Sequence, residues 1–460
     1  MAGNGRDLTE GPVWRNLVAV AGPMMFGILA VVSTGIVDAY FLAKVSPEAL
    51  AAVGFIYPVT TAIMSLSIGL SAGASAVISQ ALGRRDGHDD VTRRGLHALA
   101  LGLCFASLAA LLFWLLDKPL LGLLGADEKV LEAALRYTPI WCLAFPFLVT
   151  MMLINAIFRA HGNGFWSAAI MVASAVVNVA STPVLILGLG PVPELGIAGA
   201  AWGTFLAMAT AAALAAALAL KDGILQPCEA PLRDFMRNAK AIGGVGGPAA
   251  TSNAIRPAGM ALVTAAVATV GSDYVGGFGA ATRVQSLICV PFLALSAGIG
   301  PVVGQNWGAD RKDRSREGLR LCLLFSLGYG LLIALTLSFF AGPIAQAFGA
   351  SDDSTAAAKS YLRIVGWSLF GYGMLVTGNA SLNAISKAGH AMTLSLARVL
   401  AVYVPLAWLG VTLFGYTGIL GAAVMANVFG AWAVLVAGRA TGLLKIDMPP
   451  VRWAASRVPS

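Results

Sequence analysis

The chain has 460 residues, of which 58% are hydrophobic and only 11% are charged, and its formal net charge is +8. Soluble domains carry about a quarter charged residues, so this composition, with a mean hydropathy of +0.80, excludes a water-soluble globular protein and predicts a polytopic membrane protein. The positive charge does not indicate nucleic-acid binding, because the basic residues lie in short segments between apolar runs.

Uncharged or nearly uncharged runs recur along the whole chain, and each is long enough for a helix across about 30 Å of hydrocarbon. The short alternating segments of a β-barrel are not seen. The sequence therefore predicts an all-α protein with twelve transmembrane helices. They are expected at about residues 16–42, 49–82, 96–116, 138–158, 165–188, 195–220, 241–269, 276–306, 321–348, 364–384, 390–413 and 418–438.

The first run contains one carboxylate, Asp38, and this is the one acid of the chain that lies well inside a run. An acid at the centre of a span costs about 3 kcal/mol. Asp38 either marks the helix end close to Lys44 or is a titrating site. Burial disfavours the charged form of a carboxylate, so the second interpretation predicts proton exchange near neutral pH. Pro23, earlier in the same run, predicts a bend, either as a static kink or as a hinge.

The two halves of the sequence repeat each other. "AGPMMFG" at 21 faces "GGPAATS" at 246, and "AGASAVISQALG" at 72 matches "AGIGPVVGQNWG" at 297, both with an offset of 225. We expect a six-helix N-terminal lobe at 1–220, a cytoplasmic linker at 221–240 and a six-helix C-terminal lobe with a cytoplasmic tail at 241–460. Channels and scaffolds also contain repeats, but parallel repeats with an intramembrane acid favour a transporter.

Lysine and arginine set the predicted orientation. With the N-terminus inside, 21 of these residues lie on the cytoplasmic side, 6 lie on the opposite side and the remaining three lie within spans. This imbalance predicts that both termini are cytoplasmic.

Several motifs together resemble the multidrug and toxic compound extrusion (MATE) family, and the details are closest to its bacterial DinF-like branch. The resemblance spans essentially the whole chain. It rests on "VDAYFLAKVSPEALAAVGFIYPV", "QALGRRD", "FRAHGNG", "GIAGAAWGT" and "GAATRV" in this order. It implies a monomeric, cation-coupled antiporter that exports lipophilic drugs, dyes or toxic metabolites across the bacterial cytoplasmic (inner) membrane.

The resemblance also assigns an ion-coupling set in the N-terminal lobe. Asp38 matches the first-helix aspartate, which lies fifteen residues after the hinge proline, Pro23. Asn178 and Thr204 match polar residues of the fifth and sixth helices. The family pattern has a second acid where this chain has Thr182, and this departure leaves the coupling ion open between a proton and sodium. We expect a proton, because one carboxylate suffices for it. The hydroxyl of Thr182 has a structural alternative, which is to satisfy a carbonyl freed by Pro183.

The second half has no acid inside a span but has three arginines there, Arg256, Arg283 and Arg398. Arg256 is the cavity candidate: it either snorkels towards the interface or lines a cavity and favours anionic or zwitterionic groups. The resemblance suggests a structural role for Arg283. Basic residues inside spans also keep open an alternative function, a flippase for lipid-linked sugars or polysaccharides with the same two-lobe architecture.

Enzymatic functions lack their motifs. No HExxH, DDxxD or GxSxG motif lies in a span, and no GxxxxGK[ST] motif indicates ATP hydrolysis. The cysteines are scattered, without a Cys/His cluster. We therefore expect no catalytic residues, no metal site, no cofactor and no nucleic-acid partner. The expected partners are a proton or sodium ion, a small-molecule substrate and the lipid bilayer.

Overall fold

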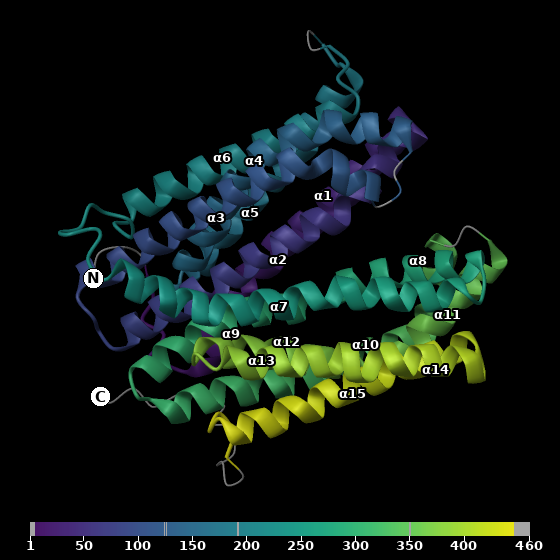
Figure 1. Cartoon of the computed structure of the whole chain (residues 1–460). Helices are drawn as coiled ribbons and strands as arrows, with labels where there is room; N and C mark the ends of the chain where they lie inside the picture. The colour runs from purple at the N-terminus through teal and green to yellow at the C-terminus, as the bar shows by residue number, and fades with distance from the viewer. Residues whose placement is uncertain (1–4, 124, 126, 191–192, 349–350, 446–460) are drawn as a thin grey trace. The chain divides into compact units, whose positions relative to one another are not determined.

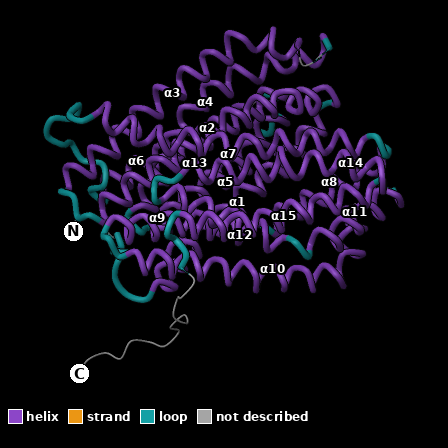
Figure 2. The backbone as a smooth tube through the Cα atoms, turned by 60° about the horizontal axis from the view of Figure 1, so that its bottom comes forward, coloured by secondary structure: helices purple, strands orange, loops and turns teal. Residues whose placement is uncertain are grey.

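The computed structural model describes residues 5–123, 125, 127–190, 193–348 and 351–445. The part of the predicted cytoplasmic tail at 446–460 lies outside this range. Helices make up nearly all of the described backbone, and no strand occurs in it (Figure 1 and Figure 2). This agrees with the all-α prediction, because a backbone in lipid must satisfy its own hydrogen bonds.

The helices follow the apolar runs in order. Their bounds are α1 Val13–Val45, α2 Pro47–Gly83, α3 His88–Leu123, α4 Glu128–Ala160, α5 Gly164–Leu187, α6 Ile197–Lys221, α7 Phe235–Ala268, α8 Ser272–Ile288, α9 Val290–Gly308, α10 Lys312–Phe348, α11 Asp352–Gly366, α12 Leu369–Ala384, α13 Ala388–Leu396, η1 Ala397–Tyr403, α14 Val404–Phe414 and α15 Tyr416–Ala440. Nine helical stretches of the described chain are long and apolar enough to cross a membrane, or ten if the bent pair α8–α9 is one span.

One predicted span is bent, and another contains a π-helix. The span at 276–306 consists of α8 and α9, which meet at an angle of 44°, and the break at Cys289 is followed by Pro291, which cannot donate a backbone hydrogen bond. The span at 390–413 contains the π-helix η1. The amide of Val404 donates to the carbonyl of Val399, five residues earlier, directly before the helix-disturbing Pro405.

The chain divides into two compact units. Unit 1 contains residues 1–6, 23–82 and 86–250, and unit 2 contains residues 7–22, 83–85 and 251–460. Two of the points where the chain passes from one unit to the other lie inside long helices. They lie in α1 between Gly22 and Pro23 and in α7 between Ala250 and Thr251. These two crossing points lie within three residues of each other when the 225-residue repeat offset is applied.

Small residues allow the first part of α7 to pack closely within unit 1. A Cβ atom on Gly69 or Gly73 of α2 would overlap the backbone of α7 at Gly246 or Ile242. The segment between α6 and α7 is also held, because Nε2 of the buried His97 of α3 donates to the carbonyl of Pro231 at 2.7 Å. The helix α7 thus begins inside the predicted linker and belongs to unit 1 as far as Ala250.

The first part of α1 packs within unit 2 in the corresponding way. Gly298 of α9 lies so close to Ala21 that a Cβ atom on it would be 2.9 Å from the Ala21 Cβ atom. Leu8, Val13 and Leu17 join a buried cluster with residues of α9 and α10. Gln305 accepts a hydrogen bond from the Leu8 amide at 2.9 Å. The N-terminal part of α1 therefore belongs to unit 2, and the N-terminal part of α7 belongs to unit 1.

Candidate ion-coupling site

Asp38 lies in the C-terminal part of α1, within unit 1, and its side chain faces helix α5. The side chains of Asn178 and Thr182 lie within interaction range of the Asp38 carboxylate. These two α5 residues are four apart and therefore occupy the same face of the helix. The structure thus brings together three of the four predicted ion-coupling residues.

Three oxygen atoms of this cluster are buried without a partner at full hydrogen-bonding geometry among the described residues. They are Asp38 Oδ1, Asn178 Oδ1 and Thr182 Oγ1. A buried polar atom without a partner costs about 1–3 kcal/mol, and such atoms are rare in folded proteins. A carboxylate, an amide oxygen and a hydroxyl are oxygen ligands of the kind that coordinate a hard cation, and the carboxylate can also take up a proton. The donor set therefore fits either predicted ion.

The Thr182 hydroxyl forms no hydrogen bond with a backbone carbonyl of the described residues, so it does not replace the bond that Pro183 removes. The neighbouring Ser181 bonds backward along the helix instead, because its hydroxyl donates to the Val177 carbonyl at 2.7 Å. Thr182 is fully buried and lies against α6, where a Cβ atom on Gly203 would be 2.5 Å from Thr182 Oγ1. Helix packing, rather than a backbone hydrogen bond, therefore holds the Thr182 hydroxyl beside Asp38.

Thr204 lies on α6, and its hydroxyl donates to the Ala200 carbonyl at 3.1 Å. Its side chain interacts with the hydroxyl of Tyr137 on α4, and Tyr137 in turn lies in the electric field of Asp38. Thr204 is thus connected to the carboxylate through Tyr137. Tyr137 was not among the predicted site residues, because it lies one residue before the span predicted at 138–158, although a tyrosine next to an apolar run, in "LRYTPIW", is a signal for a polar partner within the bundle.

Pro23 lies inside α1, directly after the point where the chain leaves unit 2. Fifteen residues separate it from Asp38, a rise of about 22 Å along a helix. A proline removes one helical hydrogen bond and crowds the preceding turn. The turn of α1 in which Pro23 removes a hydrogen bond therefore coincides with the passage of α1 between the units.

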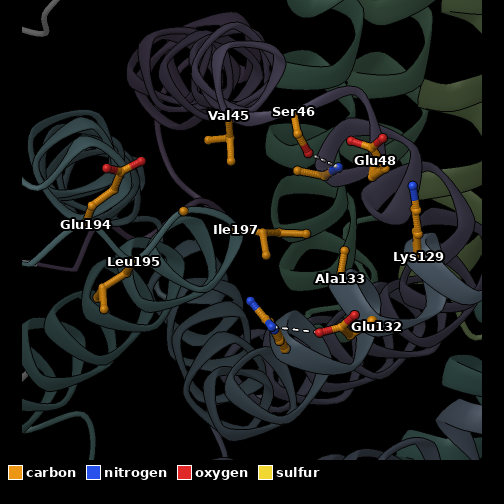
Figure 3. Close-up of a pocket in the computed structure, with 12 residues that line it drawn as sticks. Val45, Ser46, Glu48, Lys129, Glu132, Ala133, Glu194, Leu195 and Ile197 are labelled. Carbon is orange, nitrogen blue, oxygen red and sulfur yellow. Dashed lines mark hydrogen bonds and ion pairs between the residues drawn. The ribbon is translucent and has the colours of Figure 1, made fainter.

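A separate pocket of about 510 Å³ lies at the end of unit 1 (Figure 3). Charges of both signs surround it, among them Glu48, Lys129 and Glu194, and Arg136 pairs with Glu132 at 2.7 Å. None of the predicted ion-coupling residues lines this pocket. It is a polar hollow between loops and helix ends and is not part of the Asp38 cluster.

The predicted cavity residue, Arg256, lies in unit 2, where it is half-buried on α7. Its guanidinium donates to the Tyr372 hydroxyl at 3.1 Å and to the side-chain oxygen of Asn253. Arg283 is exposed on α8, and Arg398 lies on η1. Within the described residues, no group of three or more His, Cys, Asp or Glu side chains is placed to hold a metal ion.

The helices, the sequence repeat and an intramembrane acid among polar oxygens define a polytopic membrane transporter. The MatE family model matches residues 23–184 and again 248–409, and both ends of the second match are offset by the 225 residues found in the sequence. This chain therefore belongs to the MATE family of transporters and is not an enzyme.

Relatives and solved structures of this family align over nearly the whole chain. The FAD transporter of Shewanella oneidensis is 31% identical over 92% of this chain and 93% of its own length. The multidrug export protein MepA of Staphylococcus aureus is 24% identical over 93% of this chain and 94% of its own. A crystal structure of the Vibrio cholerae MATE transporter VcmN in the bent form has a TM-score of 0.87 and 29% identity, covering 93% of this chain and 96% of VcmN. The twelve-helix, two-lobe prediction is thereby confirmed.

Proposed function

We propose that this chain is a proton-coupled antiporter that exports small organic molecules across the bacterial cytoplasmic membrane, with both termini in the cytoplasm. The observation that carries the proposal is the cluster of three buried oxygens around Asp38, none of which has a partner at full hydrogen-bonding geometry among the described residues. A proton on Asp38 converts one acceptor into a donor and gives the cluster a hydrogen bond that it lacks. A single carboxylate supports one proton for each transport cycle at this site.

The proposed cycle uses the helix α1 as the moving element. Protonation of Asp38 changes its interactions with Asn178 and Thr182, and α1 bends at Pro23, which couples the ion to the release of substrate. The lobe boundaries at 1–220 and 241–460 belong to the same proposal, with α1 and α7 as the helices that connect the two lobes. A crystal structure of the VcmN transporter is described as a bent form, and this is compatible with a helix that bends.

Two substrate classes are candidates. Multidrug export is the function named for MepA, and it favours lipophilic drugs, dyes or toxic metabolites. The Shewanella relative, at 31% identity, is named an FAD transporter, and this favours an anionic flavin dinucleotide as the second candidate. Both candidates fit an antiporter in which the substrate leaves as protons enter.

Purified protein in proteoliposomes tests the coupling, with imposed pH or sodium gradients and a panel of cationic dyes and flavins. We expect export driven by the pH gradient, and we expect Asp38→Asn to abolish it because asparagine keeps the shape but cannot titrate. Asp117→Asn is the matched control, since Asp117 is also buried in unit 1 and is not part of the cluster. Wild-type export driven by sodium and indifferent to the pH gradient would overturn the proton assignment.

A further inference from the structure

Two half-buried arginines lie close together in unit 2. Arg256 is on α7, and Arg398 is on the π-helix η1. The two helices touch, because a Cβ atom on Gly259 of α7 would overlap the side chain of Val399 on η1. Each charge lies within the electric field of the other. The fold therefore places two like charges within electrostatic range of each other, among neutral tyrosine and asparagine side chains.

Every hydrogen-bond partner found for these guanidinium groups is neutral. Arg398 donates through Nη2 to the side-chain oxygen of Asn427 at 2.7 Å. Asn427 is held in turn by Ser368, whose hydroxyl oxygen accepts from Asn427 Nδ2 at 2.9 Å. Arg256 donates to a tyrosine hydroxyl and to an amide oxygen. The Arg398 Nε atom is buried and has no partner among the described residues.

Among the described residues, no carboxylate is found to pair with either guanidinium group. The electrostatic neighbours of Arg398 are three tyrosines and Arg256. The acids of the second half, apart from one beyond the described residues, lie in turns or within the first two turns of helices; they are Asp273, Asp310, Asp313, Glu317, Asp352 and Asp353. Buried charge is costly unless it is paired, so two adjacent arginines without an acid leave positive charge available for a ligand.

A purely structural role for the two arginines does not explain why they lie near each other. Hydrogen bonds from one arginine to neighbouring helices would hold them together, but a second arginine beside it destabilises the same contact by repulsion. A buried donor left without a partner adds to that cost. An anion between the two groups removes both penalties, and a planar guanidinium matches phosphate oxygens with paired donors. π-Helices also occur often at functional sites.

We propose that Arg256 and Arg398 bind the phosphate or pyrophosphate group of an organic molecule that this transporter carries. Asn427 and Tyr372 orient the two guanidinium groups through the hydrogen bonds described above. The inference rests on the proposed transport function and narrows its substrate class to organic phosphates. It assigns the cation and the anion to different units, with the proton at Asp38 in unit 1 and the phosphate in unit 2.

A flavin series tests the site, because riboflavin, FMN and FAD share one ring system and differ in phosphate content. Binding to the purified full-length protein is measured in detergent by flavin fluorescence, with inorganic pyrophosphate as competitor. We expect FMN and FAD to bind at least about ten-fold more tightly than riboflavin, and pyrophosphate to displace them. A polyisoprenyl pyrophosphate is a second competitor, and stronger displacement by it identifies a lipid-linked source for the same phosphate chemistry.

Asn427→Asp is the decisive variant. It keeps the size of the side chain and the acceptor for Arg398 but supplies an internal carboxylate, so the fold is retained and the pyrophosphate affinity falls. Arg256→Gln is expected to lower the affinity for FMN to that for riboflavin. It is also expected to weaken the binding of pyrophosphate. Arg283→Gln is the matched control, because Arg283 is exposed on α8, and it is expected to bind like the wild type.

The outcomes separate this inference from the coupling proposal. Asp38→Asn is expected to retain pyrophosphate binding while losing pH-driven export, so each proposal fails on its own measurement. Equal affinity of the wild type for riboflavin and FMN, together with no binding of either pyrophosphate compound, would overturn the phosphate site. Undiminished pyrophosphate binding by both Asn427→Asp and Arg256→Gln would also overturn it.

Discussion

Thr182 of α5 lies directly against Gly203 of α6, and a Cβ atom at position 203 would be only 2.5 Å from the Thr182 hydroxyl oxygen. Gly199, one turn earlier in α6, approaches the carbonyl of Leu185 in the same way. Small residues four apart allow helix backbones to approach closely in membranes. The position of the Thr182 hydroxyl beside Asp38 therefore depends on the absence of a side chain on α6.

The first prediction concerns this contact. Gly203→Ala should separate α5 from α6 and lower the free energy of unfolding by about 1–3 kcal/mol, which is the usual effect of overpacking. It should also reduce pH-driven export, because the hydroxyl moves away from Asp38. Gly328→Ala is the control, since a Cβ atom there would meet no described atom of a neighbouring helix within 4 Å. Thermal melting in detergent is the measurement, and Gly203→Ala should melt at a lower temperature than Gly328→Ala. Equal melting temperatures for the two variants would contradict the prediction.

Thr182→Asp should restore a second carboxylate in the cluster. Two nearby acids share their protons and titrate as one coupled unit, so the pH profile of export should broaden into two steps. The added charge should also increase the response to sodium, because a carboxylate helps to offset the dehydration of the ion. Export at fixed pH, with and without sodium, measures the change. Thr182→Asn is the neutral control, and an identical response of both variants would speak against a charge effect.

Tyr137→Phe should impair coupling without disturbing the helix bundle. The phenol hydroxyl connects Thr204 to the field of Asp38, and removing one such hydrogen bond costs about 0.5–1.5 kcal/mol. We expect export to fall about two- to ten-fold, which is the range that this energy allows. The initial rate of export against external pH is the measurement. Thr204→Val should produce a similar profile, whereas two unrelated profiles would argue against a shared path.

Pro23→Ala should slow transport and leave substrate binding intact. Alanine restores the backbone donor and removes the steric clash that bends a helix, so α1 should resist bending where it passes between the units. The turnover rate and the substrate affinity are measured separately in proteoliposomes. Pro119→Ala, in the last turn of α3, is the control for a general effect of proline removal. Wild-type turnover in Pro23→Ala would show that the proline is a static kink.

His161 should make stability depend on pH. It follows α4, Gly5 packs on its carbonyl, and burial lowers the pKa of the His161 imidazole below its ordinary value of 6.5. The hydrogen bond to the Ile157 carbonyl opposes this shift, and the charge of His88 reinforces it. The unfolded state binds this proton more readily than the folded state. The contribution of the neutral His161 to the free energy of unfolding should therefore be fully present above pH 6.5 and should be lost as the pH falls below that value. Melting temperatures of wild type and His161→Asn test this, and the variant should lose less stability on acidification.

The sequence alone determined the elements and their order. Lipid offers the backbone no hydrogen-bond partners, so each apolar run had to be helical, and the runs could be counted without any tertiary information. The offset of 225 residues likewise identified the two halves. Asp38 could be found because an acid inside an apolar span is rare and costly. Asn178, Thr182 and Thr204 were named through the family resemblance, and their contribution to ion coupling remains a prediction.

Only the tertiary structure decided which side chains meet. Asn178 and Thr182 reach Asp38 through the packing of α1 on α5, Tyr137 enters from α4, and Thr204 is connected only through it. The pairing of Arg256 with Arg398, 142 positions apart in the sequence, depends on the contact between α7 and η1. Hydropathy and spacing predict which residues of a helix lie inside the membrane span and which lie near its ends. They do not record the rotation of one helix against another, and side-chain contacts depend on that rotation.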